Sequence, residues 1–255
     1  MSEPTPAPLD EDLPPAATPS APSDSPVSIR DLLLGVIVIW GFTVMTGTVL
    51  AIGMVVKYGM DSTAMADHPM PALLVEFFCL LLTAFVVWYF TCKKYGLSFS
   101  RGLKLGPAPT PQLVWAFGIG LAVALVAGTL MTFLAHENSM IAQMVSTREG
   151  LLIVCAFAVI VPPFEEIYYR GFVFPALRRT CGVTWAMAIV ILWFGLVHAF
   201  QLFPDWAAML VVTTMGAIYT VQRHVTGSLW PPIITHLTYN AVLDAWSLVA
   251  HFSGN

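Results

Sequence analysis

Seven apolar stretches follow one another between residues 32 and 250, and they constrain the fold of this chain more than any other feature. Their approximate ranges are 32–56, 71–92, 112–135, 150–174, 183–203, 206–222 and 231–250. Most approach the roughly 20 residues that an α-helix needs to cross the hydrocarbon of a bilayer. With 57% hydrophobic and 10% charged residues, the chain is too apolar for one buried core. The sequence therefore predicts an all-α, polytopic transmembrane helical bundle of about seven spans, and excludes a cytosolic enzyme or a nucleic-acid binder.

The distribution of lysine and arginine predicts the orientation of this bundle. If the N-terminus is cytoplasmic, the cytoplasmic segments contain Arg30, Lys93, Lys94, Arg101, Lys104, Arg178, Arg179 and Arg223. The other side contains Lys57 and Arg148, which gives a split of eight to two when Arg170, part of a motif, is left out. Basic residues accumulate in cytoplasmic loops. Seven spans with a cytoplasmic N-terminus and an external C-terminus fit this distribution.

Residues 1–28 differ in composition from the rest of the chain, because they are rich in proline, alanine, serine and acidic residues. Such a segment cannot bury enough apolar surface to become ordered. We therefore expect a disordered tail, followed by a transmembrane helical domain over residues 29–255. No lysine or arginine precedes an early apolar region, so a secretory signal peptide is not expected. Without an organelle signal, the expected location is a bacterial plasma (inner) membrane.

The four cysteines have no C-x-x-C spacing, and each lies in or beside an apolar stretch: Cys79, Cys92, Cys155 and Cys181. We interpret them as small hydrophobic residues rather than as disulfides or metal ligands.

Ionisable residues inside the apolar stretches carry the main functional signal, because such groups are rare in hydrocarbon unless they are paired or functional. They are Glu76, Glu165, Glu166, Arg170, His198, His236 and Asp244, with Asn240 as a neutral polar companion. All except Glu76 fall in the last four stretches. We therefore expect the catalytic core at about residues 150–245.

The fourth stretch contains two prolines followed by two glutamates and an arginine, Pro162-Pro163-Phe-Glu165-Glu166-x-x-x-Arg170. Since proline suits the first turn of a helix, the pair predicts a helix start that places both glutamates near its N-terminus. The four-residue spacing predicts a supporting Glu166–Arg170 ion pair. Glu165 lies about 100° away around the helix and is free to react. The alternative, that both glutamates only neutralise arginines, stays open.

The fifth and seventh stretches add polar side chains that suit two chemistries. His236 and Asn240 share one helix face four residues apart, and His198 lies late in the fifth stretch. In the first chemistry, Glu165 and His198 activate a water, while His236 and Asn240 bind the oxyanion. In the second, Glu165, His198 and His236 are zinc ligands. Each residue alone also fits a packing role, and the sequence contains neither H-E-x-x-H nor G-x-S-x-G.

The ordered set E-E-x-x-x-R, F-x-x-x-H and H-x-x-x-N resembles the CPBP family of intramembrane proteases. That family includes the type II CAAX prenyl endopeptidases and bacterial abortive-infection-like proteins. The motifs read Glu165-Glu166-x-x-x-Arg170, Phe194-x-x-x-His198 and His236-x-x-x-Asn240. The resemblance implies that Glu165 is the catalytic base, that His198 helps to hold the water, and that His236 and Asn240 form the oxyanion site. Family members have been described as metal-dependent, and a metal-free glutamate mechanism is the alternative that we favour.

These observations predict an intramembrane endopeptidase of the CAAX-protease-like type, working in the lipid bilayer without a cofactor, with zinc as the alternative. The expected partner is a peptide or membrane-protein substrate, with a prenylated C-terminus if the host makes one, and no nucleic acid. Two other functions remain open: a non-catalytic scaffold or chaperone of the same fold, and a proton-coupled transporter that uses Glu165, His198 and Asp244. The scaffold is disfavoured because every motif is complete. The transporter is disfavoured because the hydropathy pattern contains no inverted repeat.

Overall fold

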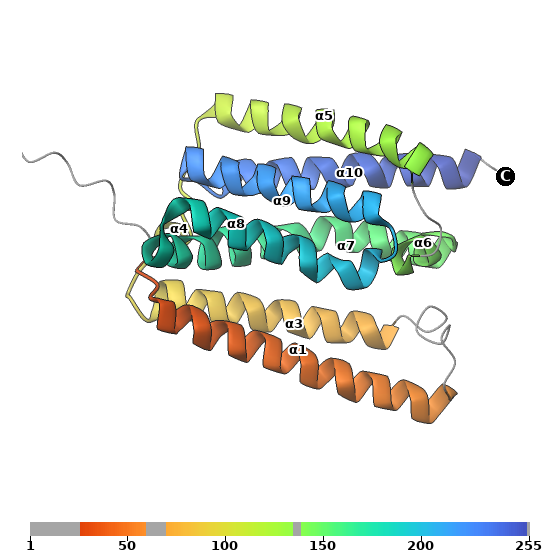
Figure 1. Cartoon of the computed structure of the whole chain (residues 1–255), viewed down its shortest axis with the longest axis horizontal. Coiled ribbons are helices and arrows are strands. Elements are labelled where there is room, and N and C mark those ends of the chain that lie inside the picture. Colours follow the sequence, from red (N-terminus) through yellow and green to blue (C-terminus); the bar gives the residue numbers. More distant parts are fainter. Residues whose placement is uncertain (1–25, 60–69, 135–138, 254–255) are drawn as a thin grey trace, which may run out of the picture.

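The computed structural model describes residues 26–59, 70–134 and 139–253, and helices are the regular secondary structure of these segments. The helices in chain order are α1 (Ile29–Tyr58), α3 (Met70–Trp88), η1 (Tyr89–Lys93), α4 (Phe99–Gly102), α5 (Thr110–Leu134), α6 (Met140–Val145), α7 (Arg148–Glu166), η2 (Ile167–Val173), α8 (Phe174–Leu202), α9 (Trp206–Thr226) and α10 (Trp230–Ser253). Figure 1 shows the long helices running roughly side by side, with α1 and α3 at one edge of the bundle and α5 at the other. The predicted all-α fold is confirmed.

Residues 1–25, which make up most of the predicted disordered tail, lie outside the described residues. The described chain starts just ahead of α1, where Val27 is fully buried. The side chains of Ser28 and Asp31 then form a reciprocal capping box that fixes the start of α1.

Four segments of the described chain are long and apolar enough to cross a membrane: Ile29–Tyr58, Leu73–Lys93, Thr110–Leu134 and Arg148–Ala199. Many of their apolar side chains face outward, among them Val56 at 81% and Phe133 at 82% exposure. An apolar outer surface of this extent is expected where lipid surrounds the helices.

The segment Arg148–Ala199 reverses direction at Gly182, where φ is 80° and ψ is 172°. A positive φ of this kind is readily available only to glycine. The reversal separates the predicted fourth and fifth apolar stretches, and it lays the second part of α8 beside α7 (Figure 1).

The expectation that Pro162 and Pro163 open a new helix is wrong. Both prolines lie inside α7, which continues to Glu166 and passes directly into the π-helical η2. Glu165 and Glu166 are therefore at the C-terminal end of α7 instead of near a helix N-terminus. Transmembrane helices tolerate internal proline when neighbouring groups bond the backbone carbonyls that it frees.

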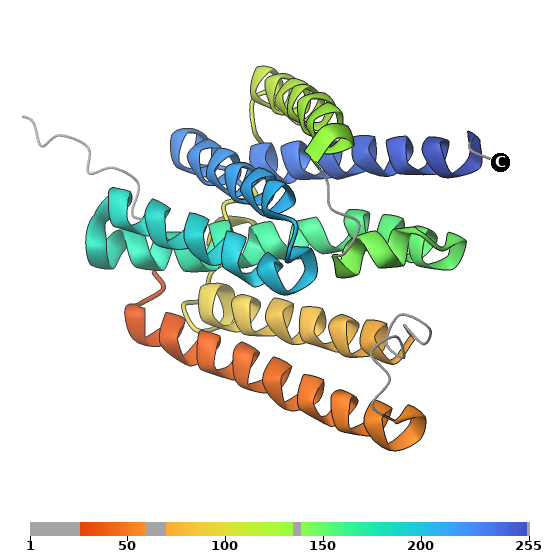
Figure 2. The ribbon, with the colours of Figure 1, turned by 45° about the vertical axis from the view of Figure 1, so that its right-hand side comes forward.

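A stripe of small residues on α5 packs against α10, as its four-residue spacing predicts. A Cβ atom added to Gly120 would lie 2.7 Å from the carbonyl oxygen of Thr235. A Cβ atom added to Gly128 would lie 3.2 Å from the ring of Trp246, and Ala124 between them is fully buried. Small residues let two helices approach this closely. The α5 and α10 contact closes one side of the bundle (Figure 2).

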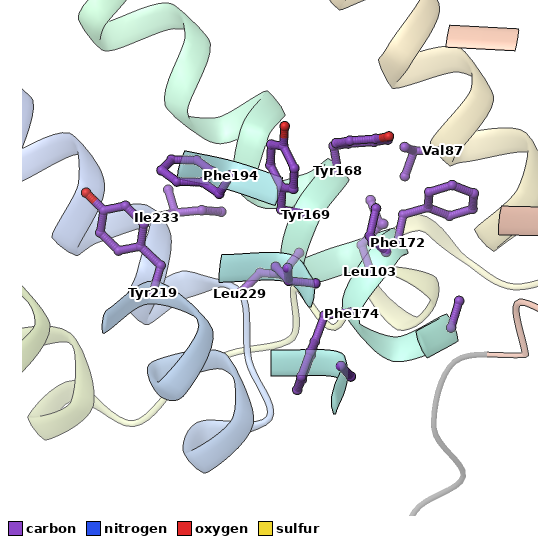
Figure 3. Packing of buried hydrophobic residues seen from close by; sticks show 14 of the residues in the cluster. Val87, Leu103, Tyr168, Tyr169, Phe172, Phe174, Phe194, Tyr219, Leu229 and Ile233 are labelled. Atoms are coloured by element: carbon purple, nitrogen blue, oxygen red, sulfur yellow. The ribbon is translucent and has the colours of Figure 1, made fainter. Parts of the chain in front are cut away.

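Aromatic residues from η2, α8 and α9 form the part of the core that lies next to the polar motifs. Figure 3 shows Phe194 between Tyr169 and Tyr219. Its ring centroid lies 5.3 Å from that of Tyr169 and 6.2 Å from that of Tyr219, both edge to face. The four cysteines are free, as expected for small hydrophobic residues.

Candidate active site

Three helical segments bring the motif side chains together in the middle of the bundle. Glu165 comes from the end of α7, His198 from α8 and His236 from the second turn of α10. An oxygen of the Glu165 carboxylate lies 3.6 Å from Nε2 of His198, and the other lies 3.8 Å from Nε2 of His236. The structure thus places both histidines next to one carboxylate, which the spacing along the chain could only suggest.

The expected pair between Glu166 and Arg170 is present and fully buried, with 3.0 Å between Oε1 and Nη1. The rest of the guanidinium donates to α9, through Nη2 to the carbonyl oxygen of Gly216 at 2.8 Å and through Nε to the hydroxyl of Thr220 at 3.3 Å. The charge also lies over the ring of Phe194, 4.6 Å from its centroid. A buried charge needs partners of this kind, and Arg170 ties η2 to α9 through them.

The ring of His198 is held in one orientation by its own helix. Its Nδ1 lies 2.7 Å from the carbonyl oxygen of Phe194, one turn earlier. Because a carbonyl oxygen can only accept, Nδ1 carries the proton. In the neutral ring, Nε2 then has a free lone pair, and this atom faces Glu165.

His236 is oriented by two neighbours. Its Nδ1 lies 3.1 Å from Oε1 of Glu166, and its ring stacks on Tyr219 with 4.4 Å between centroids and 21° between planes. Since an ionised carboxylate only accepts, Nδ1 is again the protonated nitrogen. Glu166 therefore contacts Arg170 and His236 at once, which couples the supporting pair to the histidine.

Asn240 makes a hydrogen bond that explains how α7 tolerates Pro162. Its Nδ2 donates to the carbonyl oxygen of Ala158 at 2.9 Å. In a regular helix that carbonyl would accept from residue 162, but Pro162 has no N–H. Asn240 thus replaces the missing backbone donor, and its amide keeps a second N–H for another acceptor.

A cavity of about 420 Å³ opens beside these side chains, and we call it the large cavity. Its polar lining comes from Glu76, Glu165, Gln201, His198, His236 and Asn240, along with two tyrosines, Tyr219 and Tyr239. The remaining lining is apolar, with Met140, Ile141 and Met144 of α6 at one end. A mostly apolar cavity with a few convergent polar groups is typical of a ligand site.

Asp244, one turn beyond Asn240 on α10, does not belong to this lining among the described residues. Its side chain interacts instead with that of Cys155.

Zinc is the metal that the sequence leaves open as an alternative, with Glu165, His198 and His236 as its ligands. Ligands around zinc lie about 3–3.5 Å from one another, because each is about 2.0–2.2 Å from the ion. The observed separations of 3.6 and 3.8 Å are wider. Within residues 26–59, 70–134 and 139–253, no group of three or more His, Cys, Asp or Glu side chains is arranged to hold a metal ion. As they stand, these side chains are spaced more widely than zinc ligands.

Several residues of the site could not be found from the motifs. Tyr219, Gly216 and Thr220 carry no charge, and nothing in their spacing distinguishes them from packing residues of α9. Glu76 and Gln201 also line the large cavity. The sequence did indicate a functional role for Glu76, because it is an acid within an apolar stretch. No neighbouring motif, however, indicated a partner for it.

Comparisons with known proteins agree with the motifs. Residues 147–242 match the family model described as type II CAAX prenyl endopeptidase Rce1-like. A curated relative, "Putative membrane peptidase YdiL" of Bacillus subtilis (strain 168), is 28% identical over 138 residues, or 51% of this chain. The chain spans about half the length of that relative, 54%. No solved structure matches. The segment of residues 147–242, which contains all three motifs, is thus similar to the Rce1-like, type II CAAX prenyl endopeptidase (CPBP) family of membrane peptidases.

Proposed function

We propose that this protein is an intramembrane endopeptidase that hydrolyses a peptide bond with a glutamate-activated water. The observation that carries the proposal is the position of the Glu165 carboxylate, which lies beside Nε2 of both His198 and His236. Both rings are held through Nδ1, so their Nε2 atoms are directed at the same small volume. A mostly apolar cavity adjoins this volume and can hold a peptide segment.

Glu165 and His198 are suited to bind the attacking water together. Their nearest atoms are 3.6 Å apart, which is too long for a direct hydrogen bond. One water at about 2.8 Å from each can donate a proton to both acceptors. Its lone pair then points away from them, toward a bound carbonyl carbon. Glu165 takes the proton as the new C–O bond forms, and this proton passes to the amine nitrogen when the C–N bond breaks.

His236 and Asn240 are suited to hold the oxyanion. When His236 carries a second proton, Glu165 and Glu166 are balanced by Arg170 and His236, so the four charges of the site sum to zero. Glu166 stabilises that imidazolium through its contact with Nδ1 at 3.1 Å. The protonated Nε2 and the second N–H of Asn240 can then donate to the oxygen on which negative charge develops.

Asn240→Ala is expected to reduce kcat by about 10²–10³-fold, the usual effect of losing one oxyanion donor. The bond to Ala158 offers a competing structural explanation, and Pro162→Ala separates the two because it restores the backbone N–H that this carbonyl lacks. We expect the loss to persist when Asn240→Ala is combined with Pro162→Ala. Recovery of kcat in the double variant would instead assign Asn240 to the repair of α7.

We further propose that residues 29–255 form one transmembrane domain of seven spans, with the catalytic core at about 150–245. Gly182 divides the longest candidate segment into two crossings, and α9 and α10 supply two more. The eight-to-two distribution of basic residues supports a cytoplasmic N-terminus.

Single cysteines at Ser20 and Ser253 are expected to react with impermeant thiol reagents from opposite sides of the membrane. Membrane vesicles of defined orientation supply the measurement, and a cysteine at Ser100 should behave like that at Ser20. Labelling of Ser20→Cys and Ser253→Cys from the same side would refute an odd number of spans.

The proposed substrate is a peptide or a membrane protein, with a prenylated C-terminus only in a host that makes prenylated proteins. The test compares the membrane proteome of cells that carry either the natural chain or Glu165→Gln. We expect full-length substrates to accumulate with Glu165→Gln and their fragments to disappear. Identical proteomes, with both chains equally abundant, would contradict the proposed activity.

A further inference from the structure

A second, smaller cavity lies on the other side of the Glu165 and His198 side chains. It has a volume of about 210 Å³ and lies between α1, α3, α7 and α8, and we call it the small cavity. Five residues are shared by the linings of both cavities: Glu165, His198, Glu76, Gln201 and Val161. Glu165 and His198, which are suited to hold the attacking water, thus lie between the small cavity and the large cavity.

The small cavity is rich in polar groups for a space inside a helical bundle. Its own polar lining residues are Trp40 and Thr43 of α1, Cys79 and Thr83 of α3, and Tyr168 and Tyr169 of η2. At its surface, Nε1 of Trp40 and the hydroxyl of Tyr168 are buried and interact with each other, but neither forms a hydrogen bond of good geometry with a described residue. Tyr168 itself is only 5% exposed, so beyond Trp40 its hydroxyl finds a partner of good geometry only in the cavity.

Buried polar atoms without partners cost free energy, and bound water is the usual partner when there is room for it. One water needs about 10–15 Å³ of accessible cavity volume and two to four polar neighbours. The small cavity, at about 210 Å³, has space for several waters and offers hydroxyl, indole, amide and carboxylate neighbours. The large cavity has mostly apolar walls along α6 and α7 and suits a peptide instead.

We propose that the small cavity is a water site that supplies the hydrolytic water to Glu165 and His198, while the substrate occupies the large cavity. This inference rests on the proposed function. Glu76 and Gln201, which line both cavities, are the further polar groups that join them beside Glu165 and His198. The separation lets a new water reach Glu165 without crossing the substrate, which a hydrolase embedded in hydrocarbon requires.

Thiol labelling tests whether the small cavity holds water, independently of catalysis. Single cysteines are introduced into a chain whose four natural cysteines are replaced by alanine. The test positions, Thr43→Cys and Thr83→Cys, line the small cavity. The control positions, Val44→Cys and Phe85→Cys, replace side chains that are 64% and 58% exposed at the bundle surface. A methanethiosulfonate ethylammonium reagent reacts with the thiolate, which forms only where water solvates it, so we expect the cavity cysteines to react at least about 10-fold faster. Equal rates for the cavity and surface positions would overturn the proposal.

The rate of peptide hydrolysis tests whether water from the small cavity is the water that attacks the substrate. Thr83→Leu adds apolar volume to the small cavity, so we expect kcat to fall several-fold with KM unchanged, because the substrate binds on the other side of Glu165. Thr83→Ser keeps the hydroxyl and should keep the rate, and Phe85→Leu at the bundle surface is the matched control. An unchanged kcat in Thr83→Leu would overturn the supply role. If the natural chain hydrolysed nothing, the proposed function would fail, while the labelling rates would still decide whether the cavity is hydrated.

Discussion

Glu165→Gln is expected to reduce kcat for a peptide substrate by about 10²–10⁴-fold, the range that a positioned general base contributes. Glutamine keeps the size of the side chain and can still accept a hydrogen bond, but it cannot take the proton of the water. Glu165 makes no ion pair with Arg170, and its side chain is 21% exposed beside the cavities, so the fold should be unaffected. The measurement is hydrolysis by purified protein of a peptide identified by the proteome comparison.

Glu149→Gln is the matched control, because Glu149 lies exposed in the first turn of the same helix. It should hydrolyse the peptide at the natural rate. His198→Ala and His236→Ala should be folded and nearly inactive, like Glu165→Gln. Near-normal kcat in Glu165→Gln would remove Glu165 from the role of base and would require another side chain to activate the water.

The helices were predictable because their signal is local. Each predicted apolar stretch falls largely within helical segments of the described chain, since about 20 apolar residues in a row specify a membrane-length helix in almost any context. The stripe of Gly120, Ala124 and Gly128 likewise predicted a helix contact from its spacing alone. Its partner, α10, could not be identified because spacing along one helix carries no information about the opposing surface.

The proline pair shows why the local geometry of the site was harder to predict. Proline at a helix start and proline inside a membrane helix look alike in sequence, and the difference depends on a donor elsewhere in the fold. Here that donor is Asn240, 82 positions after Ala158, whose carbonyl it bonds. A separation of 70 positions likewise hides the contact of Glu166 with His236. The Glu166–Arg170 pair was predictable because both partners lie on one helical turn.

Arg170→Ala is expected to lower the free energy of unfolding by about 3–5 kcal/mol, the usual effect of removing one partner of a buried ion pair. The change leaves Glu166 charged and fully buried, and it removes the donors to Gly216 and Thr220 that join η2 to α9. Folded yield should fall sharply, and unfolding in a denaturing detergent, followed by circular dichroism, measures the difference. Arg101→Ala, at an exposed position, is the control and should unfold like the natural chain.

The double variant Glu166→Gln with Arg170→Met distinguishes loss of charge balance from loss of packing. It removes both charges and fills the space of the guanidinium stem, so much of the stability should return, because no unpaired charge is left buried. Activity should remain low, because His236 has lost the carboxylate that stabilises its protonated form, at 3.1 Å from Nδ1. If Arg170→Ala were as stable as the natural chain and merely inactive, Arg170 would belong with the reacting groups, and the division between a reactive Glu165 and a supporting Glu166 would be wrong.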